Sequence, residues 1–234
     1  MIPKVGTKNE EIRHAWIEKQ LAELPHGSRI LDAGAGEQPY RKYCSHLHYV
    51  SQDFAQYEPT AVQSGLQMAK WDYGKPDIIC DIAAIPEPDG SFDAVLCLEV
   101  LEHVPDPVKA IRELSRLLRQ GGRLLVSAPF CSLTHFAPYH FSTGFSRFFY
   151  QKHLPENGLR LLEVTPNGNY FEYLAQELRR VNEIANRYGS SQAGRLEKNA
   201  IDKTLKMLQR FSDHDTGSHE LLAFGFHVVA EKEF

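Results

Sequence analysis

The chain has 234 residues, of which 42% are hydrophobic and 24% are charged, and its formal net charge is −4. This length suits one α/β domain with additions, and the apolar fraction is enough for a normal core. The charge balance argues against a large nucleic-acid-binding surface, and no apolar run is long enough to span a bilayer.

The cysteines and the start of the chain predict a compartment. The first six residues contain no apolar stretch of the kind found in a secretory signal. Four cysteines form no C-x-x-C pair, which favours reduced, mostly buried thiols over a zinc site. We therefore expect a cytoplasmic protein, a monomer or a homodimer, with no membrane or nucleic-acid partner. The cysteines are Cys44, Cys80, Cys97 and Cys131.

The first elements are a helix, a strand and a glycine turn. Residues 9–24 show amphipathic helical spacing, and residues 28–33 form a short apolar strand. Gly34 can take positive φ, and Gly36 lets a ligand come close to the backbone. Pro39 suits the first turn of a helix over residues 39–47, whose free N–H groups would point at that ligand.

The acid before the turn distinguishes between ligands. Pro39 stands where a dinucleotide fingerprint has its third glycine, and Asp32 lies two residues before Gly34. A carboxylate there repels a pyrophosphate and attracts a cation. S-adenosylmethionine carries an ammonium and a sulfonium and no phosphate, so it fits this turn. The alternative is an ordinary strand-to-helix turn without a ligand.

Two further strands end in acids. Residues 48–53 form a second strand whose last residue, Asp53, is placed to accept both hydroxyls of a ribose. A solvated carboxylate in a loop is the alternative. Residues 77–82 form a third strand, where Asp81 can accept from an adenine amino group and the Ile82 N–H can donate to the ring.

The order of elements predicts the fold class. Residues 92–98 and 123–128 read as buried strands, separated by a helix over 105–118 that is opened by Pro105 and capped by Gly121 and Gly122. Strands alternate with helices, which predicts an α/β, Rossmann-like, seven-stranded, mostly parallel sheet with helices on both faces. Its acids then gather at the carboxyl edge, where such sheets bind ligands. They are Asp32, Asp53, Asp81 and Glu99.

The second half continues the sheet and adds helices. We expect a helix over 144–154, a strand over 159–165, helices over 170–188 and 196–211, and a last strand over 221–231 antiparallel to the fifth. We interpret 1–234 as a single domain: a leading helix 9–24, a cofactor-binding half 28–128 and a substrate-facing half 129–234 with a helical insertion 170–211. The insertion either covers the substrate or forms a dimer contact.

The loop after the fifth strand contains the candidate catalytic residues. His135, Tyr139 and His140 lie in an aromatic segment that enters the space facing the sulfonium. Methyl transfer is a direct displacement, and a hydroxyl acceptor also needs a base, for which histidine is suited. We assign His140 first and His135 second as base or acceptor anchor. The alternative is an aromatic loop packed on the sheet.

Residues 28–128 resemble the class I S-adenosylmethionine-dependent methyltransferases of the type 11 kind, and the rest of the chain does so more weakly. The segments that carry the resemblance are Asp32–Gly36, Asp53, Asp81–Ile82, Ser91–Pro107 and Gly121–Ser127. Gln38-Pro39-Tyr40 departs from the family pattern, which often has another glycine there. The resemblance implies S-adenosylmethionine as cofactor, held by Asp32, Gly34, Ala35, Gly36, Tyr40, Asp53, Phe54, Asp81, Ile82, Leu98 and Glu99.

Glu99-x-x-Glu102-His103 has two interpretations. The pattern is similar to quinone-biosynthesis O-methyltransferases and small-RNA terminal 2′-O-methyltransferases, where such residues bind a metal, and His140 would be a fourth ligand here. In metal-free relatives the same residues tie the loop to the helix. We assign no metal ligand, keep a divalent ion as the alternative, and count His103 with the candidate catalytic residues.

The sequence therefore predicts a methyltransferase that acts on an oxygen, or secondarily a nitrogen, of a small molecule or sugar. The alternatives are a metal-dependent RNA 2′-O-methyltransferase and a methyltransferase-like module that binds a nucleoside without turnover. An NAD-dependent dehydrogenase is less favoured, because Pro39 and Asp32 oppose a pyrophosphate.

Overall fold

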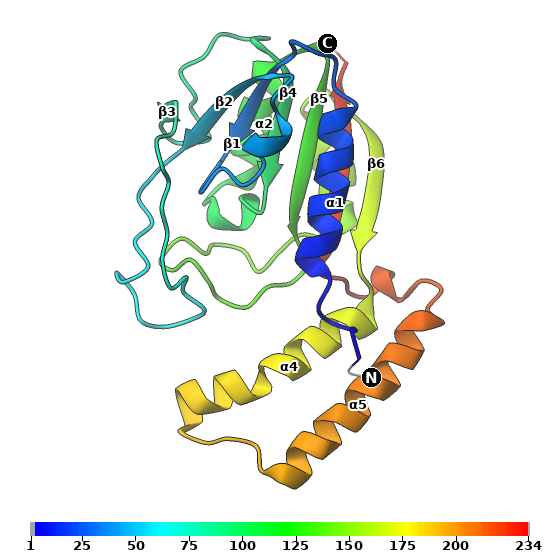
Figure 1. Cartoon of the computed structure of the whole chain (residues 1–234). Helices are drawn as coiled ribbons and strands as arrows, with labels where there is room; N and C mark the ends of the chain where they lie inside the picture. Colours follow the sequence, from blue (N-terminus) through cyan, green and yellow to red (C-terminus); the bar gives the residue numbers. More distant parts are fainter. Residues whose placement is uncertain (1–2, 234) are drawn as a thin grey trace. The chain divides into compact units, whose positions relative to one another are not determined.

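A computed structural model describes residues 3–233, which contain a seven-stranded sheet with the order β3-β2-β1-β4-β5-β7-β6 (Figure 1). The pairs β1–β2, β1–β4, β2–β3 and β4–β5 are parallel, whereas β7 is antiparallel to β5. The predicted fold class is therefore confirmed, including the antiparallel last strand.

The strands are β1 Arg29–Ala33, β2 His48–Asp53, β3 Ile78–Ile79, β4 Phe92–Leu98, β5 Leu118–Pro129, β6 Leu159–Asn167 and β7 Gly225–Lys232. The helices are α1 Asn9–Ala22, α2 Pro107–Leu117, α3 Arg147–Glu156, α4 Tyr170–Gly189 and α5 Arg195–Asp213. Short 3₁₀ turns lie at η1 Arg41–Tyr43, η2 Leu101–His103 and η3 Ser218–Glu220. None of the helices within residues 3–233 is both long and apolar enough to cross a membrane.

The described chain divides into two compact units. The sheet unit comprises residues 15–165 and 225–233, and the hairpin unit comprises residues 3–14 and 166–224. The interpretation of 1–234 as one methyltransferase domain stays a prediction. Residues 1, 2 and 234, which it includes, lie outside the described residues.

Alternation along the central strands builds the core of the sheet unit. In β4, Leu96 belongs to a buried cluster with Leu21 of α1. Its neighbour Val95 belongs to a second buried cluster with Ile111 of α2. Because successive side chains of a strand point to opposite faces, the two clusters lie on the two sides of the sheet. The strand is apolar on both faces for this reason.

The hairpin unit has a small core of its own. Ala175 of α4 and Leu205 and Leu208 of α5 are buried together with Val5. The Asn169 side chain accepts the N–H of Glu172 and caps the first turn of α4. The predicted helices 170–188 and 196–211 are thus confirmed.

The helix expected over residues 39–47 is wrong. This stretch contains only η1, with i→i+3 bonds such as Cys44 N–H to the Arg41 carbonyl at 3.0 Å. Gln38 has a φ of 56°, in the left-handed region, which separates the glycine turn from any right-handed helix.

The expected cap at Gly121 and Gly122 is also wrong, because both glycines lie inside β5. A Cβ on Gly122 would lie 2.8 Å from the Arg119 carbonyl oxygen and 3.1 Å from that of Asp93. The glycine thus permits a close backbone approach beside the register shift between Phe92 and Ala94.

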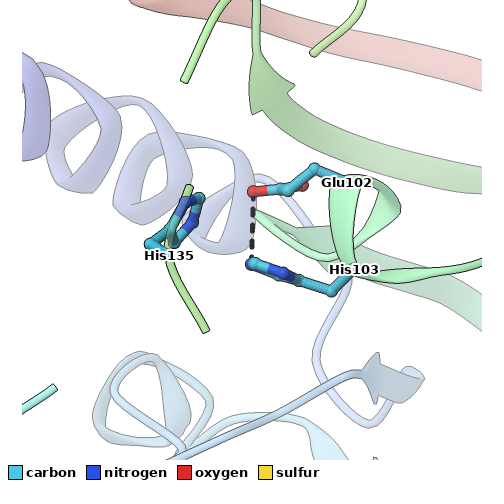
Figure 2. A group of neighbouring side chains, drawn as sticks. All are labelled: Glu102, His103 and His135. Atoms are coloured by element: carbon cyan, nitrogen blue, oxygen red, sulfur yellow. Dashed lines mark ion pairs between the residues drawn. The ribbon is translucent and has the colours of Figure 1, made fainter. Parts of the chain in front are cut away.

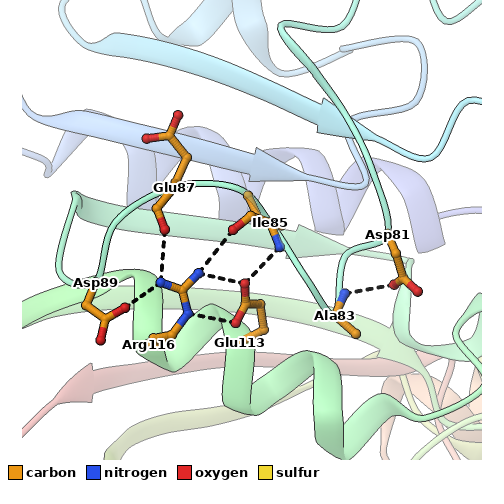
Figure 3. A network of polar contacts seen from close by, with 7 residues as sticks. All are labelled: Asp81, Ala83, Ile85, Glu87, Asp89, Glu113 and Arg116. Carbon is orange, nitrogen blue, oxygen red and sulfur yellow. Dashed lines mark hydrogen bonds and ion pairs between the residues drawn. The ribbon is translucent and has the colours of Figure 1, made fainter.

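Arg116 of α2 fixes the segment that follows β3. Its guanidinium donates to the carboxylates of Glu113 and Asp89 at 2.7 and 2.5 Å, and to the carbonyls of Ile85 and Glu87 at 3.1 and 2.9 Å (Figure 3). Glu113 in turn accepts the Ile85 N–H at 2.8 Å. Residues 85–89 are therefore tied to α2 by charge-assisted bonds.

Replacing Arg116 tests this clamp. We expect Arg116→Met to lower the free energy of unfolding by about 2 kcal/mol, because two carbonyls and two carboxylates lose their donor. Chemical denaturation measures the change. Arg112→Met, on the exposed side of the same helix, is the matched control and should change stability by less than about 0.5 kcal/mol. Equal effects of the two substitutions would contradict the clamp.

Candidate active site

The glycine turn follows β1 at the carboxyl edge of the sheet. Gly34 has a φ of 76°, as expected, and Gly36 also has a positive φ, 51°. The N–H groups of Gly34 and Ala35 donate to the Gln52 carbonyl, each at 2.9 Å, and the Gly36 N–H donates to Asp53 Oδ2 at 2.8 Å. The turn is therefore bound to the end of β2 and does not form a helix N-terminus with free donors.

Two buried carboxylates lie behind this turn. Asp32 is 3% exposed and accepts the Tyr49 hydroxyl at 2.5 Å. Burial raises the pKa of Asp32 to about 6, with the Tyr49 hydrogen bond opposing the rise and the charge of Asp53 adding to it. Burial also raises the pKa of Asp53, against hydrogen bonds from the N–H groups of Ala55 and Gly36. A cation at this edge would relieve the cost of both charges.

The other residues predicted to bind the cofactor have varied surroundings. Asp81 is exposed and accepts the Ala83 N–H at 2.8 Å, and the Ile82 side chain is buried in the core (Figure 3). Glu99 has a φ of 56° and accepts the Ser127 hydroxyl at 2.8 Å.

The remaining residues predicted to bind the cofactor pack against other side chains of the protein. Tyr40 and Leu98 are buried in the cluster beneath α1. The Phe54 ring contacts the Tyr139 ring edge-on, with 4.8 Å between centroids.

Three histidines come together next to this edge. The His103 ring lies 4.7 Å from the His135 ring and 6.1 Å from the His140 ring, and His135 and His140 are 5.1 Å apart. His103 Nδ1 is 2.5 Å from the Tyr139 carbonyl oxygen. His140 Nε2 is 3.2 Å from the Ser132 hydroxyl. The structure therefore gathers the residues that the sequence assigned to the acceptor side.

The protonation of His103 is determined by its partners. Burial, together with the neighbouring His135 and His140, lowers the pKa of His103 to about 3, so the ring is neutral at neutral pH. Because the Tyr139 carbonyl accepts, Nδ1 carries the proton and Nε2 presents a lone pair. That lone pair lies 3.7 Å from Oε1 of the fully buried Glu102 (Figure 2). Two acceptors at this distance favour a proton or a metal ion between them.

A possible metal ligand set differs from the expected one. Glu102, His103 and His135 offer ligand atoms that all lie within 4.8 Å of one another (Figure 2). Glu99, which the sequence pattern grouped with Glu102 and His103, bonds to Ser127 instead.

Sequence reasoning missed an aromatic cluster over the glycine turn. A Cβ on Gly36 would lie 2.8 Å from the Trp71 ring. Trp71 meets Phe136 edge-on at 4.6 Å between centroids, and Phe136 stacks on Tyr57 at 4.0 Å. Residues 59–73 have no helix or strand periodicity. Their only signal is the presence of large aromatic residues in a polar stretch.

Comparisons with known proteins find similarity to methyltransferases. A family model described as a methyltransferase domain matches residues 31–126. A ubiquinone biosynthesis O-methyltransferase from Xanthomonas oryzae pv. oryzae (strain PXO99A) is 40% identical over 105 residues, 43% of this chain and 43% of that protein. A second one, from Xanthomonas axonopodis pv. citri (strain 306), is 38% identical over 126 residues, 50% and 48% of the two chains. The chain thus spans less than half the length of these curated relatives.

A solved structure of a SAM-dependent methyltransferase from Archaeoglobus fulgidus has a TM-score of 0.56 at 15% identity, covering 95% of this chain and 94% of that one. At this identity, the likeness concerns the fold.

The raised pKa of Asp32 predicts how stability depends on pH. Its carboxyl has an ordinary value of 3.8 and a folded value of about 6, so the folded protein holds more protons between these two pH values. The free energy of unfolding should therefore fall by up to about 3 kcal/mol as pH rises from about 4 to above 6. Asp32→Asn should lack this decline, and denaturant titrations at several pH values measure it.

Asp202→Asn, an exposed position on α5, is the control and should decline as the wild type does. An Asp32→Asn variant whose stability follows the wild type at every pH would contradict the raised pKa.

Proposed function

We propose that this chain, whose residues 31–126 match a family model described as a methyltransferase domain, is a class I S-adenosylmethionine-dependent methyltransferase that transfers a methyl group to an oxygen of a small-molecule acceptor. One observation carries the proposal: the buried carboxylates of Asp32 and Asp53 behind the glycine turn. Buried acids without a cationic partner are costly, and a positively charged adenosine compound supplies that partner. A phosphorylated nucleotide would increase the repulsion.

The roles within the cofactor site are part of this proposal. Asp32 faces the ammonium and sulfonium, Asp53 accepts the ribose hydroxyls, and Asp81 accepts from the adenine amino group beside the Ile82 N–H. Asp53 would exchange its bond to the Gly36 N–H for the sugar. The other proposed contacts are Gly34, Ala35, Tyr40, Phe54, Leu98 and Glu99.

The acceptor side needs a base and a way to hold the acceptor. When bound, S-adenosylmethionine supplies an activated methyl group on its sulfonium. Burial and the neighbouring His135 lower the pKa of His140, so its ring is neutral near pH 7 and can take the proton of an acceptor hydroxyl. We assign His140 as base, with His135 and Tyr139 orienting the acceptor. His103 holds this loop through the Tyr139 carbonyl.

Several observations support an oxygen acceptor of small size. The curated relatives are named as O-methyltransferases of ubiquinone biosynthesis, and a net charge of −4 does not favour RNA. We also propose a cytoplasmic location, because the four cysteines are free thiols.

Calorimetry of S-adenosylhomocysteine binding tests the cofactor site. Asp53→Ala should weaken binding by at least about 1 kcal/mol, or roughly fivefold, because charge-assisted bonds to the ribose are lost. Asp202→Ala, at an exposed position on α5, serves as the control. In a thermal-shift assay, S-adenosylhomocysteine should stabilise the wild type and NADH should not. An unchanged affinity of Asp53→Ala, or stabilisation by NADH alone, would contradict the proposal.

The approach of Glu102, His103 and His135 favours a second form of the function. One carboxylate and two imidazoles suit a divalent transition metal, and such an ion would lower the pKa of an acceptor hydroxyl bound to it. This form also includes the 2′-hydroxyl of RNA as acceptor.

A metal titration separates the two forms. If an ion binds, MnCl₂ should raise the melting temperature of the wild type and leave that of His135→Ala unchanged. Equal responses of the two proteins, or none in either, would remove the metal from the mechanism.

A further inference from the structure

The space directly above Gly36 is filled by side chains of the protein itself. The six-membered part of the Trp71 indole lies 2.8 Å from the position of a Cβ on Gly36, so its ring packs on the backbone that a ligand would have to approach. Phe136 and Tyr57 pack behind it, with centroids 4.6 Å from Trp71 to Phe136 and 4.0 Å from Phe136 to Tyr57. Tyr57 is only 3% exposed. We call these three rings the plug.

The plug is assembled from two loops. Tyr57 and Trp71 belong to residues 54–75 between β2 and β3, here called the strap, and Phe136 belongs to residues 130–143 after β5, here called the acceptor loop. The Leu66 N–H donates to the Thr134 carbonyl at 2.8 Å. Leu66 and His135 form an isolated parallel bridge. The two loops are therefore joined by backbone contacts as well as by rings.

The acceptor loop also contains the proposed base. His135 directly follows Thr134, and Tyr139 and His140 lie a few residues later in the same loop. The Tyr139 carbonyl is bound to His103. Phe136 lies between His135 and Tyr139 in the same loop, so a displacement of its backbone would shift these groups relative to His103.

We propose, on the basis of the function proposed above, that the methyl donor enters by displacing the plug, and that this displacement rearranges the acceptor loop. The donor then binds before the acceptor, because the acceptor side takes its working arrangement only after Trp71 has left Gly36.

The backbone and the hydrogen bonds of the strap are suited to such a movement. Ala55 and Phe136, near the start of the strap and within the acceptor loop, have φ values of 52° and 54°. Non-glycine residues rarely adopt this region, so a change at these positions relieves strain. The strap is held to the segment after the glycine turn by single hydrogen bonds, from the Asp72 N–H to Glu37 Oε1 at 3.1 Å and from Gln38 Nε2 to the Tyr73 carbonyl at 3.3 Å. Such bonds contribute little net free energy and are exchanged readily.

Tryptophan fluorescence tests whether Trp71 moves. The chain has two tryptophans, and Trp16→Phe keeps a ring against His227, on which Trp16 stacks at 4.6 Å. In this variant Trp71 is the sole reporter. S-adenosylhomocysteine should change its emission with the same Kd that calorimetry gives. Full calorimetric binding with unchanged emission would overturn the plug alone, whereas no calorimetric binding would overturn the proposed function and the plug together.

Binding kinetics test whether the plug is an obstacle. Trp71→Ala should raise the association rate constant of S-adenosylhomocysteine about tenfold in stopped-flow measurements, and Trp71→Phe should lie between it and the wild type. The Trp16→Phe protein is the control, with an unchanged rate. Association that is equally fast in all four proteins would overturn the proposal, and the Phe variant keeps the test available if Trp71→Ala does not fold.

Hydrogen exchange tests the link between the loops. In the wild type, S-adenosylhomocysteine should change the protection of amides in residues 130–143. Leu66→Pro removes the N–H that binds the Thr134 carbonyl and should reduce this change by at least half, whereas Leu66→Ala keeps the N–H and should retain it. Identical exchange patterns in both variants would overturn the coupling.

Discussion

The burial of two carboxylates at the ends of adjacent parallel strands is the constraint on which this site depends. The hydrogen bond from Gly36 N–H to Asp53 Oδ2, 2.8 Å long, joins the glycine turn to β2. The Tyr49 hydroxyl of β2 donates to Asp32 and so joins β1 to β2. These bonds offset only part of the cost of removing charge from water, as the raised pKa of Asp32 shows. The two buried carboxylates at this edge are therefore only partly stabilised by the protein, and the proposed cofactor carries the positive charge that would stabilise them further.

Those parts of the fold that depend on local pattern were predictable from the sequence. β4 occupies the predicted residues 92–98, and α4 and α5 fall within two residues of their predicted limits. In these segments the helical spacing of apolar residues, or a continuous apolar run, is compatible with only one type of secondary structure. The absence of a helix after the glycine turn was not predictable, because the left-handed φ of Gln38 arises in the folded turn. Gly122 likewise reads as a cap until the close carbonyls of its neighbours are known.

The site could be predicted in outline only. Parallel strands bring their carboxyl ends to one edge, so the gathering of Asp32 and Asp53 follows from topology alone. The contact between the rings of His103 and His135 depends on the path of the loop after β5, which is held to His103 by the Tyr139 carbonyl. No rule of sequence spacing predicts that path. Trp71 is a stronger example. Its contact with Gly36 spans two loops without regular structure, and contacts of that kind leave no periodic trace in a sequence.

The Arg116 clamp makes one end of the proposed site more rigid than the other. It ties residues 85–89, which lie a few residues after Asp81, to helix α2, whereas Gly36 in the glycine turn is covered by the Trp71 ring from a loop. If an adenosine compound binds as proposed, its purine would lie against this anchored segment and its amino-acid end against the two loops. Analogues altered at the purine would be rejected by misfit, but those altered at the other end could be accommodated, so selective inhibitors of this protein are best elaborated from the sulfur outward.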